Sequence, residues 1–156
     1  MATKILGLDK EKVGSLNEGL NELLANFQIY YQNLRGLHWN IKGQSFFELH
    51  VKFEELYTDT QEKIDLIAER ILTLQGTPMH TFEDYLKNSQ IRVGKNISKD
   101  REAVQLVVES LTTLIELERR LLSESGEADD EGTNAMMSDF LSEQEKTVWM
   151  LNSWLS

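Results

Sequence analysis

The sequence predicts an all-α fold, a bundle of four long helices in a single domain. A chain of 156 residues suits one hydrophobic core, since it would bury about 70% of its unfolded surface. One proline and nine glycines are too few for the frequent turns of an all-β chain. Apolar residues instead recur three or four positions apart over long stretches, which is the spacing of a buried helix face. We therefore expect residues 1–156 to form one helical domain.

The first two long helices are expected to form an antiparallel hairpin. The first follows Asp9, a suitable N-cap, and its apolar stripe continues for about seven turns. Gly43 ends it, and Ser45 with Glu48 forms the capping-box pattern that begins the second helix. The second helix should continue to a stop at Gly76. Because the link between them is short, the two helices should lie side by side.

The second half of the chain predicts two more long helices after an extended connection. Residues 76–97 are long for a loop in a compact domain unless they carry structure of their own. Thr81 and Asp84 form a capping-box pattern, which predicts a short helix over residues 82–89. A third long helix should cover residues 98–126, and a fourth should follow the acidic stretch after it. Four long helices with one long middle connection form the ferritin-like variant of the helix bundle.

Composition excludes several classes of function. The chain has no cysteine, which removes disulfides, zinc–thiolate sites, iron–sulfur clusters and thiol catalysis, so any metal must be held by His, Asp and Glu. A net charge of −10 argues against a nucleic-acid partner. The longest apolar run is the four residues 148–151, and no signal-peptide pattern opens the chain. We therefore expect a cytoplasmic protein with no membrane partner.

A polar constellation lies around the turn between the first two helices. His38 continues the buried stripe of the first helix, and His50 lies equally far from the turn on the second. In an antiparallel hairpin the two imidazoles should face each other at the same height. A polar stripe continues along the second helix from His50 through Glu54 to Asp65 and Glu69. Imidazoles and carboxylates on one face suit a divalent ion such as iron(II) or manganese.

The spacing prevents these residues from forming one site within one chain. His50 and Asp65 are 15 residues apart, about 22 Å along a helix axis. A two-fold axis near residues 57–60 would lay the same helix of a partner antiparallel, so that His38 and His50 meet the partner's Asp65 and Glu69. The chain also lacks the intrachain Glu-x-x-His pattern of other di-iron bundles. The sequence therefore predicts two equivalent intersubunit sites in each dimer.

The motif Asn-Leu-Arg-Gly-Leu-His-Trp-Asn at residues 33–40 resembles a known family. Together with His50, Asp65 and Glu69, at offsets of 12, 27 and 31 from His38, it is similar to the ferroxidase motif of the Dps mini-ferritins, the DNA-binding proteins from starved cells. The resemblance covers almost the whole chain. It implies a ferroxidase, an oxidoreductase that acts on iron(II), preferably with hydrogen peroxide. It also implies a homododecameric shell that stores iron(III) mineral and protects against oxidative damage.

The resemblance also implies a role for each ligand. His38, Asp65 and Glu69 would hold the first of two irons in each site. His50 and Glu54 would serve a second, weaker iron, partly through water. Glu54 stands where many members have the shorter Asp. Zinc is an alternative occupant of the same ligand set.

Two further features follow from the resemblance alone. Trp39, beside the site, is similar to a family tryptophan that takes up oxidising equivalents. In the family, ions enter through acidic pores on three-fold axes near the start of the fourth helix. This implies Asp130 and Glu131 as pore residues.

Two other interpretations remain open from the sequence. One is a DNA-binding, nucleoid-condensing shell with little ferroxidase activity, and the other is a structural bundle whose polar stripe serves subunit contacts. Members that bind DNA often use lysine-rich tails, whereas residues 1–12 carry three lysines against two acidic residues. A histidine on a buried stripe is ordinarily a satisfied core group. It is the combination of His38 with His50, Asp65 and Glu69 that predicts a metal site.

Overall fold

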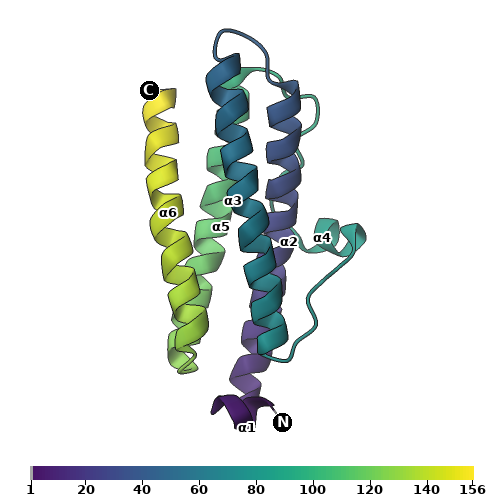
Figure 1. Ribbon diagram of the computed structural model, residues 1–156, viewed down its shortest axis with the longest axis vertical. Coiled ribbons are helices and arrows are strands. Elements are labelled where there is room, and N and C mark those ends of the chain that lie inside the picture. The colour runs from purple at the N-terminus through teal and green to yellow at the C-terminus, as the bar shows by residue number, and fades with distance from the viewer. Residues whose placement is uncertain (1) are drawn as a thin grey trace.

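The computed structural model describes residues 2–156, and over this range the chain forms six helices and no strand. The helices are α1 (Ala2–Leu6), α2 (Lys10–Asn40), α3 (Phe46–Thr73), α4 (Phe82–Asn88), α5 (Asp100–Glu127) and α6 (Glu131–Leu155). The four long helices lie side by side along the molecule, and the short α4 stands at its flank next to α2 (Figure 1). The predicted four-helix bundle with a short extra helix in the middle connection is confirmed.

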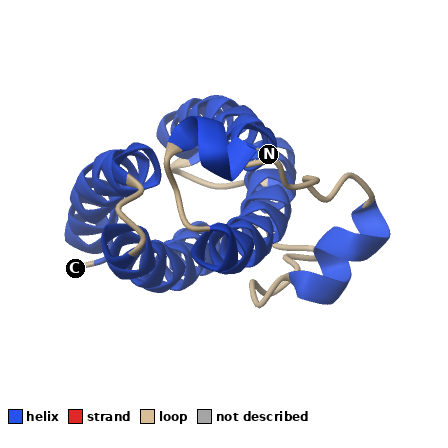
Figure 2. Cartoon of the chain, turned by 90° about the horizontal axis from the view of Figure 1, so that it is seen from below, coloured by secondary structure: helices blue, strands red, loops and turns tan. Residues whose placement is uncertain are grey.

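The topology pairs the helices as two hairpins. Helices α2 and α3 are antiparallel neighbours, as are α5 and α6 (Figure 1). The connection between α3 and α5 returns the chain from one end of the bundle to the other, so α3 and α5 point the same way. Viewed along the bundle, the long helices surround a shared interior and α4 lies outside it (Figure 2).

The core is built from the inward stripes of all four long helices. Phe27 of α2, Phe53 of α3, Leu114 of α5 and Met137 of α6 are completely buried. Phe27 also meets Phe140 edge to face, with 6.0 Å between ring centroids. Burial of each such side chain contributes about 1.5–3 kcal/mol, which holds the four long helices together. None of the helices of residues 2–156 has the length and apolar composition that a bilayer span requires.

Two buried asparagines of α2 hold the middle connection against the bundle. The side-chain oxygen of Asn26 accepts hydrogen bonds from the backbone N–H groups of Gln90 and Ile91, at 2.9 and 3.3 Å. Asn33 accepts from the Gly94 N–H at 2.8 Å and donates to the Arg92 carbonyl at 2.8 Å. The irregular connection does not pair these backbone groups with one another. The two asparagine amides supply their hydrogen bonds instead, and so fix the path of the connection.

The N-terminal caps confirm two predictions and correct one. The Asp9 carboxylate accepts from two N–H groups of the first turn of α2, both at 3.0 Å. The Thr81 hydroxyl accepts from the Asp84 N–H at 3.2 Å, which begins α4. Ser45 precedes α3 but makes no side-chain cap bond, so the capping box predicted with Glu48 is wrong. Its backbone, at φ −90° and ψ 15°, lies outside the extended region that an N-cap side chain needs.

The ends of α3 and α5 also differ from the predicted stops at Gly76 and Gly126. The residues in the left-handed conformation that ends each helix are Gln75, with φ 63°, and Asp129, with φ 55°. In both cases the next N–H bonds the carbonyl five residues back, at 2.8 and 2.9 Å, which is the Schellman arrangement. Gly126 lies inside α5 as an ordinary helical residue.

Candidate metal centre

Two stacked histidines form the centre of the candidate site. His38, in the last turn of α2, and His50, in the second turn of α3, have ring centroids 3.8 Å apart and planes 10° from parallel. The Nδ1 atom of His38 lies 2.6 Å from the backbone oxygen of His50. The Nδ1 atom of His50 lies 2.7 Å from the backbone oxygen of His38. The predicted meeting of the two imidazoles is therefore present, and each ring is held by the other residue's backbone.

These reciprocal hydrogen bonds determine which ring nitrogen can bind a metal. A carbonyl oxygen only accepts, so each Nδ1 must carry a proton and donate it. In the neutral imidazole the proton on Nδ1 leaves the Nε2 lone pair free. Metal-ligating histidines are commonly oriented by such a bond from the other nitrogen. His38 and His50 are thus prepared as Nε2 ligands.

Aromatic side chains hold the histidine pair in place. Phe46 stacks on His50 with centroids 4.9 Å apart, and Tyr57 meets His38 edge to face at 5.5 Å. The Tyr57 hydroxyl lies 3.5 Å from a carboxylate oxygen of Glu54, which brings this predicted ligand to the same side of α3. Partial burial and the Glu54 charge raise the pKa of Tyr57. Tyr57 lies on the polar stripe that the sequence predicts along this helix, whereas Phe46 was not predicted as part of the site.

The other two predicted ligands lie away from the histidines. Asp65 and Glu69 are exposed, one turn apart, far along α3 from His50. In the part of the chain that the structure describes, neither carboxylate takes part in an ion pair or side-chain hydrogen bond. Over these residues no group of three or more His, Asp and Glu is close enough to hold a metal ion. One chain therefore brings together the two histidines and leaves Asp65 and Glu69 separate.

Known proteins share this fold and sequence. Residues 17–156 match the family described as the ferritin-like domain. A DNA protection during starvation protein from Porphyromonas gingivalis is 42% identical, covering 97% of this chain and 95% of that one. The chain belongs to the ferritin-like family, among the Dps proteins.

Solved Dps structures agree with this assignment. A Dps protein from Vibrio cholerae, described as a member of the ferritin-like diiron-carboxylate proteins, has a TM-score of 0.97. It is 52% identical and covers 100% of this chain and 98% of its own. Dps from Listeria innocua soaked with zinc has a TM-score of 0.86 at 27% identity, with 90% and 95% covered. The resemblance predicted from the histidine motif is therefore confirmed.

Trp39 of this Dps chain projects away from the core. Its side chain is 58% exposed, and the Arg35 guanidinium lies 4.9 Å from its ring centroid. Arg35 also lies 5.3 Å from the Tyr31 ring, and Tyr31 meets Tyr57 edge to face at 6.0 Å. Trp39 follows His38 in the chain, and Arg35, Tyr31 and Tyr57 connect its ring to the histidine pair. Its redox role stays a prediction.

The two predicted pore residues differ in their surroundings. Asp130 is buried and caps α6, accepting from the Thr133 N–H at 3.1 Å and from Arg70 Nη2 at 2.5 Å. Glu131 is exposed in the first turn of α6. Asp130 is therefore occupied in holding the start of the helix. Of the two, Glu131 is free to meet an ion, and the pore itself stays a prediction.

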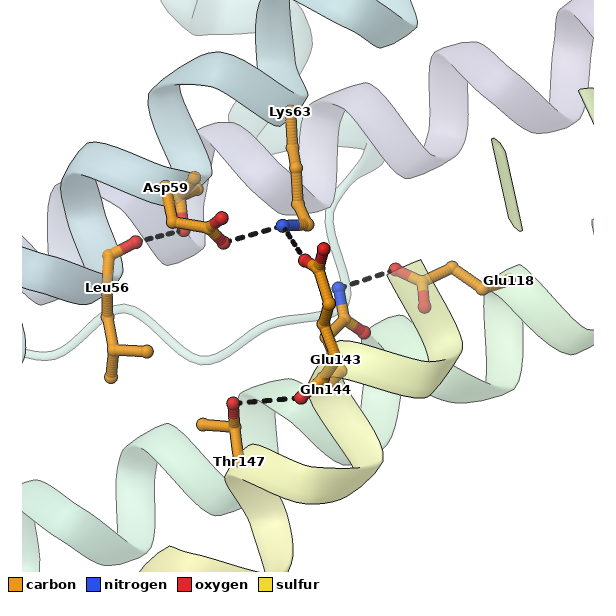
Figure 3. Close-up of polar contacts among 8 residues, drawn as sticks. Leu56, Asp59, Lys63, Glu118, Glu143, Gln144 and Thr147 are labelled. Carbon is orange, nitrogen blue, oxygen red and sulfur yellow. Dashed lines mark hydrogen bonds and ion pairs between the residues drawn. The ribbon is translucent and has the colours of Figure 1, made fainter. Parts of the chain in front are cut away.

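At the edge of the bundle interior the buried Lys63 ammonium meets two exposed carboxylates, a charge cluster that the sequence did not predict. The Lys63 ammonium lies 2.7 Å from Asp59 and 2.6 Å from Glu143, and thereby links α3 to α6 (Figure 3). Burial lowers the pKa of Lys63, but its hydrogen bonds to the two carboxylates outweigh this and raise it. In other di-iron bundles metal ligands project into this interior. Here a lysine ammonium is the cation that the carboxylates bind.

Proposed function

We propose that this chain is the subunit of a cytoplasmic mini-ferritin that oxidises iron(II) with hydrogen peroxide and stores iron(III) mineral in a hollow shell. The observation that carries the proposal is the reciprocally bonded pair of His38 and His50. The backbone bonds occupy both Nδ1 atoms and leave both Nε2 atoms at one place as candidate metal ligands. A core histidine pair would use its second nitrogen on a protein partner.

A second copy of the chain completes the site. Large apolar side chains are exposed along the same helix as the ligands: Phe47, Val51, Leu66 and Leu72. A two-fold axis across the middle of α3 would place Val51 near the partner subunit's Leu66, because the two lie about equally far from it. Covering such a row is a usual reason for association. The same axis brings His38 and His50 to the partner subunit's Asp65 and Glu69.

The ligand set assigns the chemistry. His38 with the partner's Asp65 and Glu69 would hold the first iron, and His50 with Glu54 the second. Two iron(II) ions give one electron each to one hydrogen peroxide, which takes up two protons and leaves as two water molecules. Carboxylate oxygens favour the more highly charged iron(III), so they make the oxidation easier. Because both electrons arrive together, no hydroxyl radical is released.

The assembly follows the family. We propose a homododecameric shell, with Glu131 near an ion pore and Trp39 as a redox partner of the site. The net charge of −10 on each chain favours the gathering of cations and opposes DNA binding. Zinc is expected to compete with iron for the same ligands, and the zinc-soaked Listeria innocua structure supports testing it.

The test is iron oxidation by the Asp65→Ala variant. Iron(II) is loaded without oxygen, peroxide is added, and iron(III) formation is followed by ultraviolet absorbance. We expect the initial rate to fall at least tenfold, because the first iron loses an anionic ligand. Asp139→Ala removes the same charge from an exposed position of α6 and should keep the wild-type rate. Equal rates in wild type and Asp65→Ala would refute the site.

A further inference from the structure

A buried carboxyl group and a buried amide face each other between α5 and α6. Glu118 is completely buried, and Gln144 is 5% exposed. Gln144 Nε2 donates to Glu118 Oε1 at 2.8 Å. The second carboxylate oxygen of Glu118, Oε2, and the amide oxygen of Gln144, Oε1, are buried and have no hydrogen-bond partner. Figure 3 shows these two oxygens on the same side of the existing hydrogen bond.

Two unpaired acceptors side by side are unfavourable, because each has lost its hydrogen bonds to water and gained none in the protein. One proton removes both penalties. A proton on Glu118 Oε2 turns that oxygen into a donor toward Gln144 Oε1, and the two groups then share two hydrogen bonds in a ring. We propose that Glu118 is a proton-binding site of the folded subunit, and that its neutral carboxylic acid forms a cyclic pair with Gln144 that joins α5 to α6.

The surrounding charges do not replace this proton. Tyr30 of α2, Lys63 of α3 and Arg119 of α5 interact electrostatically with Glu118. Asp59 of α3 and Glu143 of α6 surround it indirectly, through their ion pairs with Lys63. Lys63 is a buried cation, but Asp59 and Glu143 already bind it. Arg119 is exposed and paired with Glu145. Burial raises the pKa of Glu118 from 4.5 to about 8, against the lowering effect of Gln144 and the two cations.

A proton site of this kind makes stability depend on pH with a definite sign. In the unfolded chain Glu118 loses its proton above its ordinary pKa of 4.5, whereas the folded chain keeps it up to about 8. Between these values the folded state binds one more proton, so stability falls as pH rises. The equilibrium constant for unfolding should rise about tenfold for each pH unit in this window from Glu118 alone. The stability that the folded chain gains from the Glu118 proton is fully present below pH 4.5.

The variant Glu118→Gln tests the assignment. Glutamine keeps the ring of two hydrogen bonds, because its amide donates to Gln144 Oε1 and accepts from Nε2. Unfolding of the assembled protein is compared at fixed concentration from pH 5 to pH 8. The ratio of wild-type to Glu118→Gln unfolding constants should rise about tenfold per pH unit. Glu116→Gln, which removes an exposed carboxylate from the same helix, should show no such change relative to wild type.

An infrared measurement tests the proton directly in the wild-type protein. The difference spectrum between wild type and Glu118→Gln at pH 6 should contain the carbonyl band of a protonated carboxylic acid. That band should disappear when the pH is raised well above 8. If the spectrum contains only carboxylate bands at pH 6, or if wild type and Glu118→Gln keep a constant ratio of unfolding constants, the proposal is wrong.

Discussion

At the scale of single residues, the candidate centre depends on backbone carbonyls near the α2–α3 turn. His38 lies in the last turn of α2, where carbonyl oxygens have no partner within the helix. Its free oxygen accepts the proton of His50 Nδ1. The spacing of the two histidines predicts that they meet, and the structure confirms it. The reciprocal hydrogen bonds could not be predicted, because they depend on the exact height at which α2 ends beside α3.

Asp130, the N-cap of α6, is expected to contribute strongly to stability. Replacing Asp130 with Asn should destabilise the fold by about 2–4 kcal/mol, because Arg70 loses its buried counter-charge. Asp129→Asn is the matched control. Asp129 is exposed with φ 55°, a conformation that asparagine tolerates, so its variant should remain within about 0.5 kcal/mol of wild type. Thermal unfolding measures both, and equal melting temperatures for the two variants would contradict the role of the cap.

At the scale of elements, the link after α3 depends on close approach to α2. A Cβ atom at Gly76 would lie 2.8 Å from Asn17 side-chain atoms and 2.9 Å from Ile71 Cγ2. Asn17 in turn donates to the Leu74 carbonyl at 3.1 Å, which ends α3 against α2. We therefore expect Gly76→Ala to lower the free energy of unfolding by about 1–3 kcal/mol.

Gly14 supplies the control for this substitution. It lies inside α2, and a Cβ atom there would meet no atom within 4 Å. Gly14→Ala should raise stability by about 0.5–1 kcal/mol, because alanine loses less backbone freedom in a helix. Chemical denaturation of both variants gives the comparison. A Gly76→Ala protein as stable as wild type would show that α2 and the link adjust without cost.

The long helices were predictable, while their ends and the polar interior were not. Periodic apolar residues identify all four long helices, and the capping-box pattern of Thr81 and Asp84 identifies the short α4. The predicted stops failed because Gln75 and Asp129 adopt the left-handed conformation that glycine usually supplies. Lys63 and Glu118 are buried, although a pattern of polar and apolar residues assigns charged side chains to the surface. Glu118 falls within the apolar stripe of α5, and this position was the one feature of the sequence that could have predicted its burial.

At the scale of the whole molecule, the central feature is an incomplete site. The described chain brings His38 and His50 together, while Asp65 and Glu69 lie exposed and unpaired along α3, about 22 Å and 28 Å from His50. No closure of a single subunit can bridge this distance, because His50, Asp65 and Glu69 lie on one helix and His38 is bonded to the His50 backbone. The sequence predicts this separation directly from the count of residues.

The most direct test mixes two inactive variants, His38→Ala and Asp65→Ala, each with little peroxide-dependent iron oxidation alone. After unfolding and refolding together, a mixed dimer keeps one whole site, formed by His38 of one subunit and Asp65 of the other. Equal, random mixing should restore about a quarter of the wild-type sites, since half of the dimers are mixed and each has one of two sites intact. Recovery near this level, in mixed shells verified by mass, is the predicted result. Activity no greater than that of the separate variants would contradict the intersubunit site.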